Sequence, residues 1–391
     1  MKMTRKIVAL LLIGVLLLSL PACKEEPKNT HLDWLYIPSS ATMGTLSETG
    51  YYNSLNGVLT YSDIATGTSV VLCQKAGCKH EHGLEGNDRC DAELSTPWMV
   101  FGNDTLYYVD RNTLFSRNAT GGEMRELGTL AKKLIEKGIS VDVFPLAASN
   151  GYLYYEGTIL ESKQTASGGT SSTSSGSCIG RFNLAQRKDE LLVVLEQAEY
   201  SEKVEVIAAR ENGILYLYQE GLDPEQDWTK VDAKKRLEAQ KKMPVHIKHL
   251  NTATGETTVL FTTTYAECKT VHTLENGKIF YGGGNGTSSY DLNTEKSESF
   301  YKGEFSSSYY GKGYWQRKKL LDAQTAEYHI YDMNTGKTLP YELKGNFTVT
   351  NKSANGMVMM DFVTGIYSYV SFDSLADGLQ ESDLKPLYTN S

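Results

Sequence analysis

Three cysteines and a histidine lie within eighteen residues, and their types and spacing point to a specific chemistry. They are Cys73, Cys78, His80 and Cys90, with a further imidazole at His82. Thiolate sulfur and imidazole nitrogen are the ligands that hold zinc in tetrahedral protein sites. The four residues between the first two cysteines leave room for a chelating turn. Two of the three thiols could instead form a disulfide, so the compartment of the protein matters.

The N-terminal residues indicate export. Three positive charges, at Lys2, Arg5 and Lys6, precede an unbroken apolar run over residues 7–18. A positive start, a short apolar stretch and small residues before a cleavage site define a secretory signal. A membrane-spanning helix needs about 20 apolar residues, which this run does not reach.

The end of the signal looks like a lipobox, in which the cysteine thiol receives a lipid before the peptide is cut. The residues are Leu20-Pro21-Ala22-Cys23. A two-chain lipid gives lasting membrane attachment, whereas one chain binds only marginally. We therefore predict a signal peptide over residues 1–22, lipid attachment at Cys23, a tether over 23–32 and a domain over 33–391. The expected location is the extracellular side of the cell membrane.

Export bears on the thiol cluster because secreted proteins usually oxidise their cysteines. We place a disulfide first, joining Cys90 to Cys73 or Cys78. A zinc site comes second, and free or mixed thiols third. With Cys23 lipidated, five cysteines are left, so at least one has no partner within the chain. A disulfide or a zinc site here would be structural rather than catalytic.

A two-part hairpin repeat runs along the rest of the chain and predicts the fold. The first part is a turn followed by an aromatic-rich strand, and it recurs seven times: at Thr49-Gly50, Asn103-Asp104, Asn150-Gly151, Asn212-Gly213, Asn276-Gly277, Lys312-Gly313 and Asn355-Gly356. The second part is a strand ending in an Asp or Asn turn, clearest at Asp63, Asn251, Asp291 and Asp332 and degenerate at Ser371-Phe372-Asp373-Ser374-Leu375. Asn-Gly reverses a chain tightly, and Asp or Asn caps its own backbone two residues on.

The spacing of the units, from 36 to 64 residues, brackets that of four-stranded propeller blades. We predict an all-β, seven-bladed β-propeller with short helical insertions, in preference to a β-sandwich. We expect residues 35–49 to complete the last blade. Two insertions, at 127–137 and 228–243, predict helices. A Ser/Gly/Thr tract at 164–177 predicts a flexible loop.

The thiol segment resembles one found in uncharacterised lipoproteins of anaerobic Gram-positive bacteria. It reads Leu72-Cys73-Gln74-Lys75-Ala76-Gly77-Cys78-Lys79-His80 and continues with Cys90-Asp91-Ala92. Those proteins carry a domain similar to the β-propeller of the low-density-lipoprotein receptor, and they have proline where this chain has Ala76. The resemblance implies the same fold and location. It implies no enzymatic activity, because none is established for the family.

The net charge of the chain argues against one class of ligand. Removing residues 1–22 takes away three positive charges and lowers the formal charge from −8 to −11, which argues against nucleic-acid binding. We predict a non-enzymatic binding or scaffold module for a protein or carbohydrate ligand, with Trp98, Trp228 and Trp315 as aromatic candidates. The alternatives are an enzyme acting on glycan or peptide at the propeller mouth, and an accessory subunit of an envelope complex. The sequence assigns no catalytic residue.

Overall fold

The turn residues of the repeat fold as their chemistry predicts. Asn150 and Gly151 both adopt positive φ, and so do the pairs at 103–104, 276–277 and 312–313. Two residues of this kind form the tight turn that matches the twist of the flanking strands. Gly50, Gly213 and Gly356 differ: they begin strands, and a Cβ on Gly356 would collide with the Tyr369 hydroxyl.

The second part of the repeat is an Asx turn. The Asp63 carboxylate accepts the Thr66 amide at 2.8 Å, and the Asn251 side chain accepts the Ala253 amide at 2.9 Å. Asp291 and Asp332 accept the amides two residues on in the same way. The seventh copy, at 371–375, is instead part of the 3-10 helix η2 (Phe372–Asp377). The degenerate sequence there predicts the loss of the turn.

The computed structural model describes residues 34–37, 44–81, 83, 90–94, 96, 98–122, 124–164, 170–196, 202–223, 225–283, 286–302, 306–320 and 326–389. The predicted signal peptide at 1–22, the anchor Cys23 and the tether at 23–32 lie outside these residues, as does His82. Residues 34–391 form one compact unit. None of the helices in the described part of the chain has the length and hydropathy needed to cross a bilayer.

The described strands form seven antiparallel sheets, each with four consecutive strands, and the fourth sheet has one further strand from the start of the chain. The first three are β2 (Thr45–Leu46), β3 (Gly50–Leu55), β4 (Val58–Asp63) and β5 (Ser69–Val71); β6 (Met99–Gly102), β7 (Thr105–Asp110), β8 (Thr113–Asn118) and β9 (Arg125–Thr129); and β10 (Ser140–Ser149), β11 (Tyr152–Gln164), β12 (Thr170–Asn183) and β13 (Lys188–Leu195). The fourth is β14 (Lys203–Arg210), β15 (Gly213–Gln219), β16 (Pro244–Asn251) and β17 (Thr257–Thr264). The last three are β18 (Thr270–Glu275), β19 (Lys278–Gly283), β20 (Gly286–Asp291) and β21 (Lys296–Lys302); β22 (Ser306–Gly311), β23 (Tyr314–Leu320), β24 (Ala326–Asp332) and β25 (Lys337–Pro340); and β26 (Phe347–Lys352), β27 (Gly356–Asp361), β28 (Ile366–Ser371) and β29 (Lys385–Thr389).

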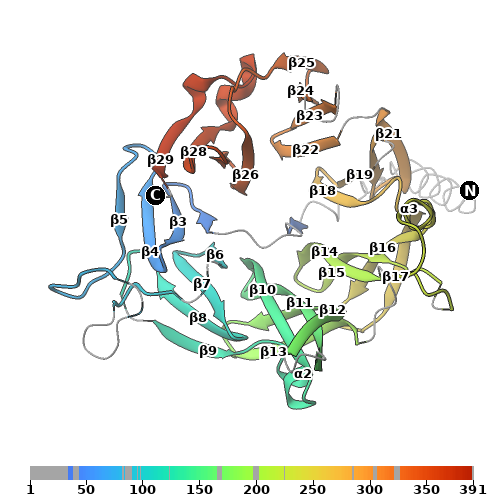
Figure 1. The fold of residues 1–391 in the computed structure, drawn as a ribbon, viewed down its shortest axis with the longest axis horizontal. Helices are drawn as coiled ribbons and strands as arrows, with labels where there is room; N and C mark the ends of the chain where they lie inside the picture. The colour runs from blue at the N-terminus through green and yellow to red at the C-terminus, as the bar shows by residue number, and fades with distance from the viewer. Residues whose placement is uncertain are drawn as a thin grey trace, which may run out of the picture. The chain divides into compact units, whose positions relative to one another are not determined.

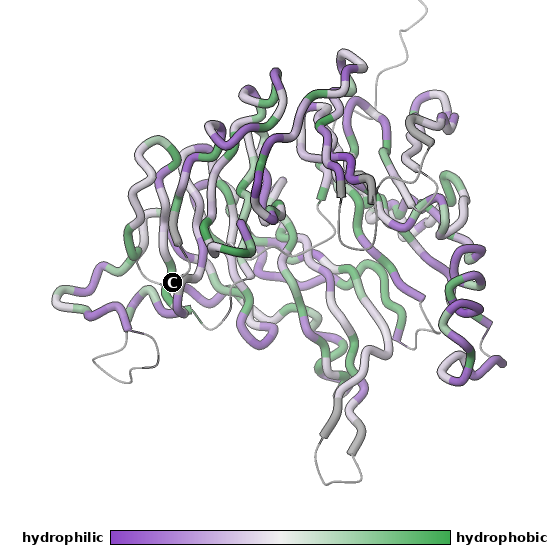
Figure 2. The backbone as a smooth tube through the Cα atoms, turned by 45° about the horizontal axis from the view of Figure 1, so that its top comes forward, coloured by the Kyte–Doolittle hydropathy of each residue, from purple (hydrophilic) through white to green (hydrophobic). Residues whose placement is uncertain are grey.

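These sheets are the blades of a seven-bladed β-propeller, which confirms the predicted fold class (Figure 1). The hydrophobic core of the described residues falls into seven clusters, and each cluster joins two neighbouring blades. Leu46 and Tyr51 of the first blade, for example, pack with Val358 and Tyr367 of the last. In Figure 2 the hydrophobic segments lie mainly along the strands. Each blade is therefore stable only because it is packed between two others.

The prediction that residues 35–49 complete the last blade is wrong. Strand β1 (Leu35–Tyr36) pairs with β14 as a fifth, innermost strand of the fourth blade, and β2 is the innermost strand of the first. The last blade takes all four of its strands from residues 347–389. The ring closes through side chains instead: Asn351 on β26 donates to the Gly44 carbonyl at 2.9 Å and accepts the Leu46 amide at 3.2 Å.

The insertions differ in part from expectation. Residues 127–137 contain the end of β9 and a short helix, α2 (Lys132–Glu136), and residues 228–243 contain α3 (Ala233–Lys241). The flexible loop predicted at 164–177 is wrong for residues 170–177, which belong to strand β12 and pair with β11; residues 165–169 lie outside the described part of the chain. Backbone pairing with an adjacent strand outweighs the weak strand preference of these small polar residues.

Candidate metal centre

The four predicted ligands converge in the structure. The sulfur atoms of Cys73, Cys78 and Cys90 and a ring nitrogen of His80 all lie within 4.8 Å of one another. Around one zinc ion, sulfur atoms 2.3 Å from the metal would be about 3.8 Å apart, so a small contraction would close the shell. All three thiols are free in the structure. His82 lies outside the described residues.

The cluster lies in the connection between the first and second blades. Strand β5, the outermost of the first blade, leads directly into Cys73. The chain returns through Cys90 to Leu94, whose amide donates to the Gly57 carbonyl, while the Leu59 amide donates to the Ala92 carbonyl. These bonds dock the returning segment on the start of β4. The cluster therefore holds a long excursion against the outside of two blades.

Each thiol accepts a backbone amide from two residues further on. The Lys75 amide donates to Cys73, the His80 amide donates to Cys78 at 3.4 Å, and the Ala92 amide donates to Cys90. Amides directed at sulfur stabilise a thiolate, which is the form that binds metals. A disulfide gains little from them, because its sulfur atoms carry no charge. This repeated arrangement favours zinc over a disulfide.

Burial and the backbone amides act on the thiol pKa values in opposite directions. Burial would raise the pKa of Cys73, but the Lys75 amide, Cys78, the Asp91 amide and Cys90 bring it below the ordinary value. Cys90 is 2% exposed, and burial raises its pKa to about 12 despite the Ala92 amide. A bound cation would be needed to hold Cys90 as a thiolate beside Cys73.

His80 completes the donor set from a left-handed backbone conformation, with φ of 58°. This conformation costs a non-glycine residue roughly 1–2 kcal/mol. Its Nδ1 atom lies 3.8 Å from the Cys90 sulfur. Three thiolates and one imidazole fill a tetrahedral shell without an open position, which is the pattern of structural rather than catalytic zinc.

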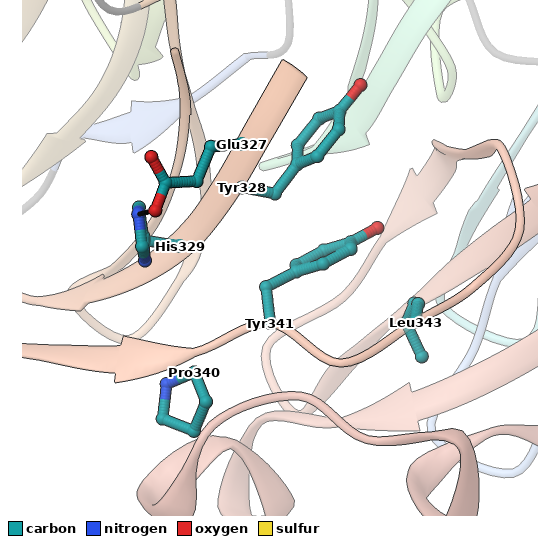
Figure 3. A pocket seen from close by; sticks show the side chains of 6 residues that line it. All are labelled: Glu327, Tyr328, His329, Pro340, Tyr341 and Leu343. Atoms are coloured by element: carbon teal, nitrogen blue, oxygen red, sulfur yellow. Dashed lines mark ion pairs between the residues drawn. The ribbon is translucent and has the colours of Figure 1, made fainter. Parts of the chain in front are cut away.

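A second feature is a shallow pocket at the outer strands of the sixth blade, with a volume of about 420 Å³ (Figure 3). Its lining residues are Glu327, Tyr328, His329, Pro340, Tyr341 and Leu343. The rings of Tyr328 and Tyr341 stack with centroids 5.2 Å apart, and the Glu327 carboxylate lies 3.0 Å from His329 Nε2. The volume lies within the range of small-molecule sites. Our sequence reasoning missed this pocket, because its residues come from β24, the end of β25 and the segment that follows it, with no shared motif.

Among the aromatic candidates, Trp315 is not available to a ligand. It is 1% exposed and packs against Tyr309, Phe280 and His272. Trp98 is half-buried with its ring edge-on to Phe144, and the half-buried Trp228 donates to the Asp223 carbonyl at 2.8 Å. Tryptophan in this chain therefore serves mainly to pack the blades.

An enzyme at the propeller mouth would need converging carboxylates, and Glu156 is the most perturbed acid among the described residues. Burial raises its pKa to about 8; the Val206 amide opposes this shift and the Glu205 charge adds to it. Its carboxylate accepts the Val206 amide at 2.6 Å, across the seam between the third and fourth blades. Glu205 is paired with Lys203 at 2.5 Å. Glu156 thus satisfies a backbone amide at a β-bulge.

The Glu156 environment predicts a pH dependence of stability. Because its folded pKa exceeds the ordinary glutamate value, the folded protein binds more protons than the unfolded chain between about pH 4.5 and 8. The free energy of unfolding should fall over this window, by about 5 kcal/mol at most. Glu156→Gln keeps the acceptor and cannot ionise, so urea unfolding at pH 5 and 8 should show a flatter profile. Glu298→Gln, on the exposed part of β21, is the control and should leave the slope unchanged. An unaltered slope in Glu156→Gln would refute the assignment.

Solved structures with a similar fold are distant in sequence. A puromycin hydrolase variant in complex with PGG aligns with 87% of this chain and 53% of its own, at 10% identity and a TM-score of 0.51. Dipeptidyl peptidase 4 from Porphyromonas gingivalis aligns over 90% and 60%, at 9% identity and 0.49. Oligogalacturonate lyase from Vibrio parahaemolyticus aligns over 85% and 89%, at 9% identity and 0.49.

This chain therefore spans about 60% of the length of the dipeptidyl peptidase. No protein-family model and no curated protein matches it. At 10% identity, the similarity to the puromycin hydrolase variant shows the propeller fold alone.

Proposed function

We propose that this chain is a lipoprotein, anchored through Cys23 outside the cell membrane, whose propeller binds a ligand and is braced by one zinc ion. The observation that carries the proposal is the convergence of three thiols and one imidazole within 4.8 Å. The amides directed at each sulfur support zinc, and the apolar run ending at Cys23 supports the anchor.

The zinc is structural in this proposal. It would be bound by Cys73, Cys78, His80 and Cys90, and it would fix the excursion between the first two blades. A rigid ring with long connections is a suitable frame for binding, because ligand sites concentrate on loops held by a rigid scaffold.

The ligand site that we propose is the pocket on the sixth blade. The stacked rings of Tyr328 and Tyr341 offer an apolar surface on one face of β24, and Glu327 and His329 offer hydrogen-bonding groups on the other face of the same strand (Figure 3). This combination suits a sugar ring, which has an apolar face and a polar edge. Tyr341→Ala should weaken binding of envelope glycans to the mature protein at least tenfold while its zinc content is unchanged. If Tyr341→Ala and the parent protein bound glycans equally well, the pocket would not be the ligand site.

The zinc proposal is tested by counting metal and free thiols in mature protein purified without reductant. We expect one zinc per chain and three thiols that become reactive only after a chelator is added. Cys78→Ser should reduce the zinc content to less than one tenth of that value. A disulfide between Cys90 and either Cys73 or Cys78, with no bound zinc, would contradict the proposal.

A further inference from the structure

The two ends of the propeller ring differ in what they carry. Each blade's first strand ends at a tight turn to the second strand, such as the turns at 150–151 and 276–277. We call the end with these turns and the Asx turns the turn face. The opposite end, which we call the loop face, carries the connections between blades and the insertion with α3.

Strand β1 fixes where the chain enters this ring. It runs antiparallel to β14, with Leu35 opposite Ala209, Tyr36 opposite Ala208, and the Ile37 amide bonded to the Ile207 carbonyl. Strand β14 runs toward the turn face and ends there at Arg210. The chain therefore enters at the turn face and runs along the inner edge of the fourth blade toward the loop face. In Figure 1, β1 is the short blue strand beside β14 near the centre of the ring.

Trp34 secures this entry point. It is 9% exposed, and its ring lies edge-on to His249 with the Arg210 guanidinium 4.5 Å from the ring centroid. Arg210 borders the turn between the first two strands of the blade.

From this entry point we infer which side of the propeller faces the membrane: the turn face lies toward the bilayer and the loop face is presented away from it. The inference rests on the proposed lipid anchor at Cys23. It places the Tyr328–Tyr341 pocket, which lies where β24 begins and β25 ends, on the side away from the lipid.

The length of the tether enforces this orientation. Ten residues, Lys24–Asp33, separate the anchor from Trp34, and fully extended they reach at most about 36 Å. From β1 to the outer strand β17 there are four strand spacings, roughly 19 Å. The seven residues of β15 give the ring a height of roughly 23 Å. A path around the rim to the loop face exceeds about 40 Å, which the tether does not reach.

Energy transfer from the lipidated protein to the bilayer tests the inference. Two exposed positions flank strand β16 on opposite sides. Ala253 lies in the Asx turn after the strand, and Leu237 lies on α3 before it. Each is replaced in turn by an azide-bearing amino acid and labelled with the same donor dye. The protein is then reconstituted in phosphatidylcholine vesicles that contain an acceptor lipid. We expect transfer from position 253 to be at least twice that from position 237.

Controls separate the orientation from the anchor. Inserting about thirty Gly and Ser residues between Lys28 and Asn29 should abolish the difference, because the tether then reaches around the rim. Cys23→Ala should abolish vesicle binding and all transfer. Protein that binds vesicles but transfers equally or more from position 237 overturns the orientation alone. Protein that fails to bind although Cys23 is intact overturns the anchor itself.

Discussion

Cys90→Ala should abolish zinc binding and destabilise the excursion between the first two blades. Cys90 is 2% exposed and packs with Leu59, Ala92 and Leu106. Removing one of four ligands opens the shell, and zinc affinity should fall at least 100-fold. Metal affinity that requires the folded ligand set is also folding free energy, so the thermal midpoint should fall. Competition with a chromogenic chelator and a thermal melt measure the two effects.

Cys178→Ala is the matched control for this substitution. Cys178 is also a fully buried free thiol, but it lies on β12 in the third blade and packs in a different cluster. It should lose stability through packing while retaining one zinc per chain. Equal zinc affinity in Cys90→Ala and the parent protein would exclude Cys90 as a ligand.

Asn351→Leu should weaken the seam between the last and first blades. The Asn351 side chain is 8% exposed and bonds both the Gly44 carbonyl and the Leu46 amide. Leucine has a similar volume but satisfies neither group, and two buried polar groups left unpaired should cost roughly 2–4 kcal/mol. In the described residues, no strand of the last blade pairs with a strand of the first. No backbone hydrogen bonds between strands therefore compensate for the two lost side-chain bonds. Hydrogen exchange should quicken in β2 and β26 before the blades opposite.

The comparison for this variant is Asn293→Leu, an exposed turn position in the fifth blade. It should change the free energy of unfolding by less than about 0.5 kcal/mol. If hydrogen exchange in Asn351→Leu quickened equally in all seven blades, the contact between the last and first blades would not be the least stable part of the ring. The bond from Ser69 to the Leu387 carbonyl at 3.1 Å, across the same seam, offers an independent site for the same test.

The sequence predicts the blades well because their turns depend on local chemistry. Asn150-Gly151 and Asp63 adopt the predicted conformations through their own side chains and φ preferences, without help from distant residues. Which blade residues 35–49 join depends instead on pairing with strands far away in the sequence. Leu35 pairs with Ala209, far along the chain, and nothing in its sequence distinguishes the fourth blade from the seventh.

The same contrast applies to the candidate sites. The spacing of Cys73, Cys78, His80 and Cys90 identifies the residues that meet, but the choice between zinc and a disulfide depends on where backbone amides point. The role of Glu156 also depends on the folded structure, because the Val206 amide that donates to it belongs to another blade. A signal was nevertheless present, since Glu156 interrupts the apolar run Tyr152–Leu160.

X-ray absorption at the zinc edge of the purified mature protein tests the central claim most directly. The account predicts one zinc per chain with three sulfur ligands at about 2.3 Å and one nitrogen at about 2.0–2.1 Å. Zinc surrounded only by oxygen and nitrogen, or protein without zinc whose Cys90 is joined to Cys73 or Cys78, would contradict it.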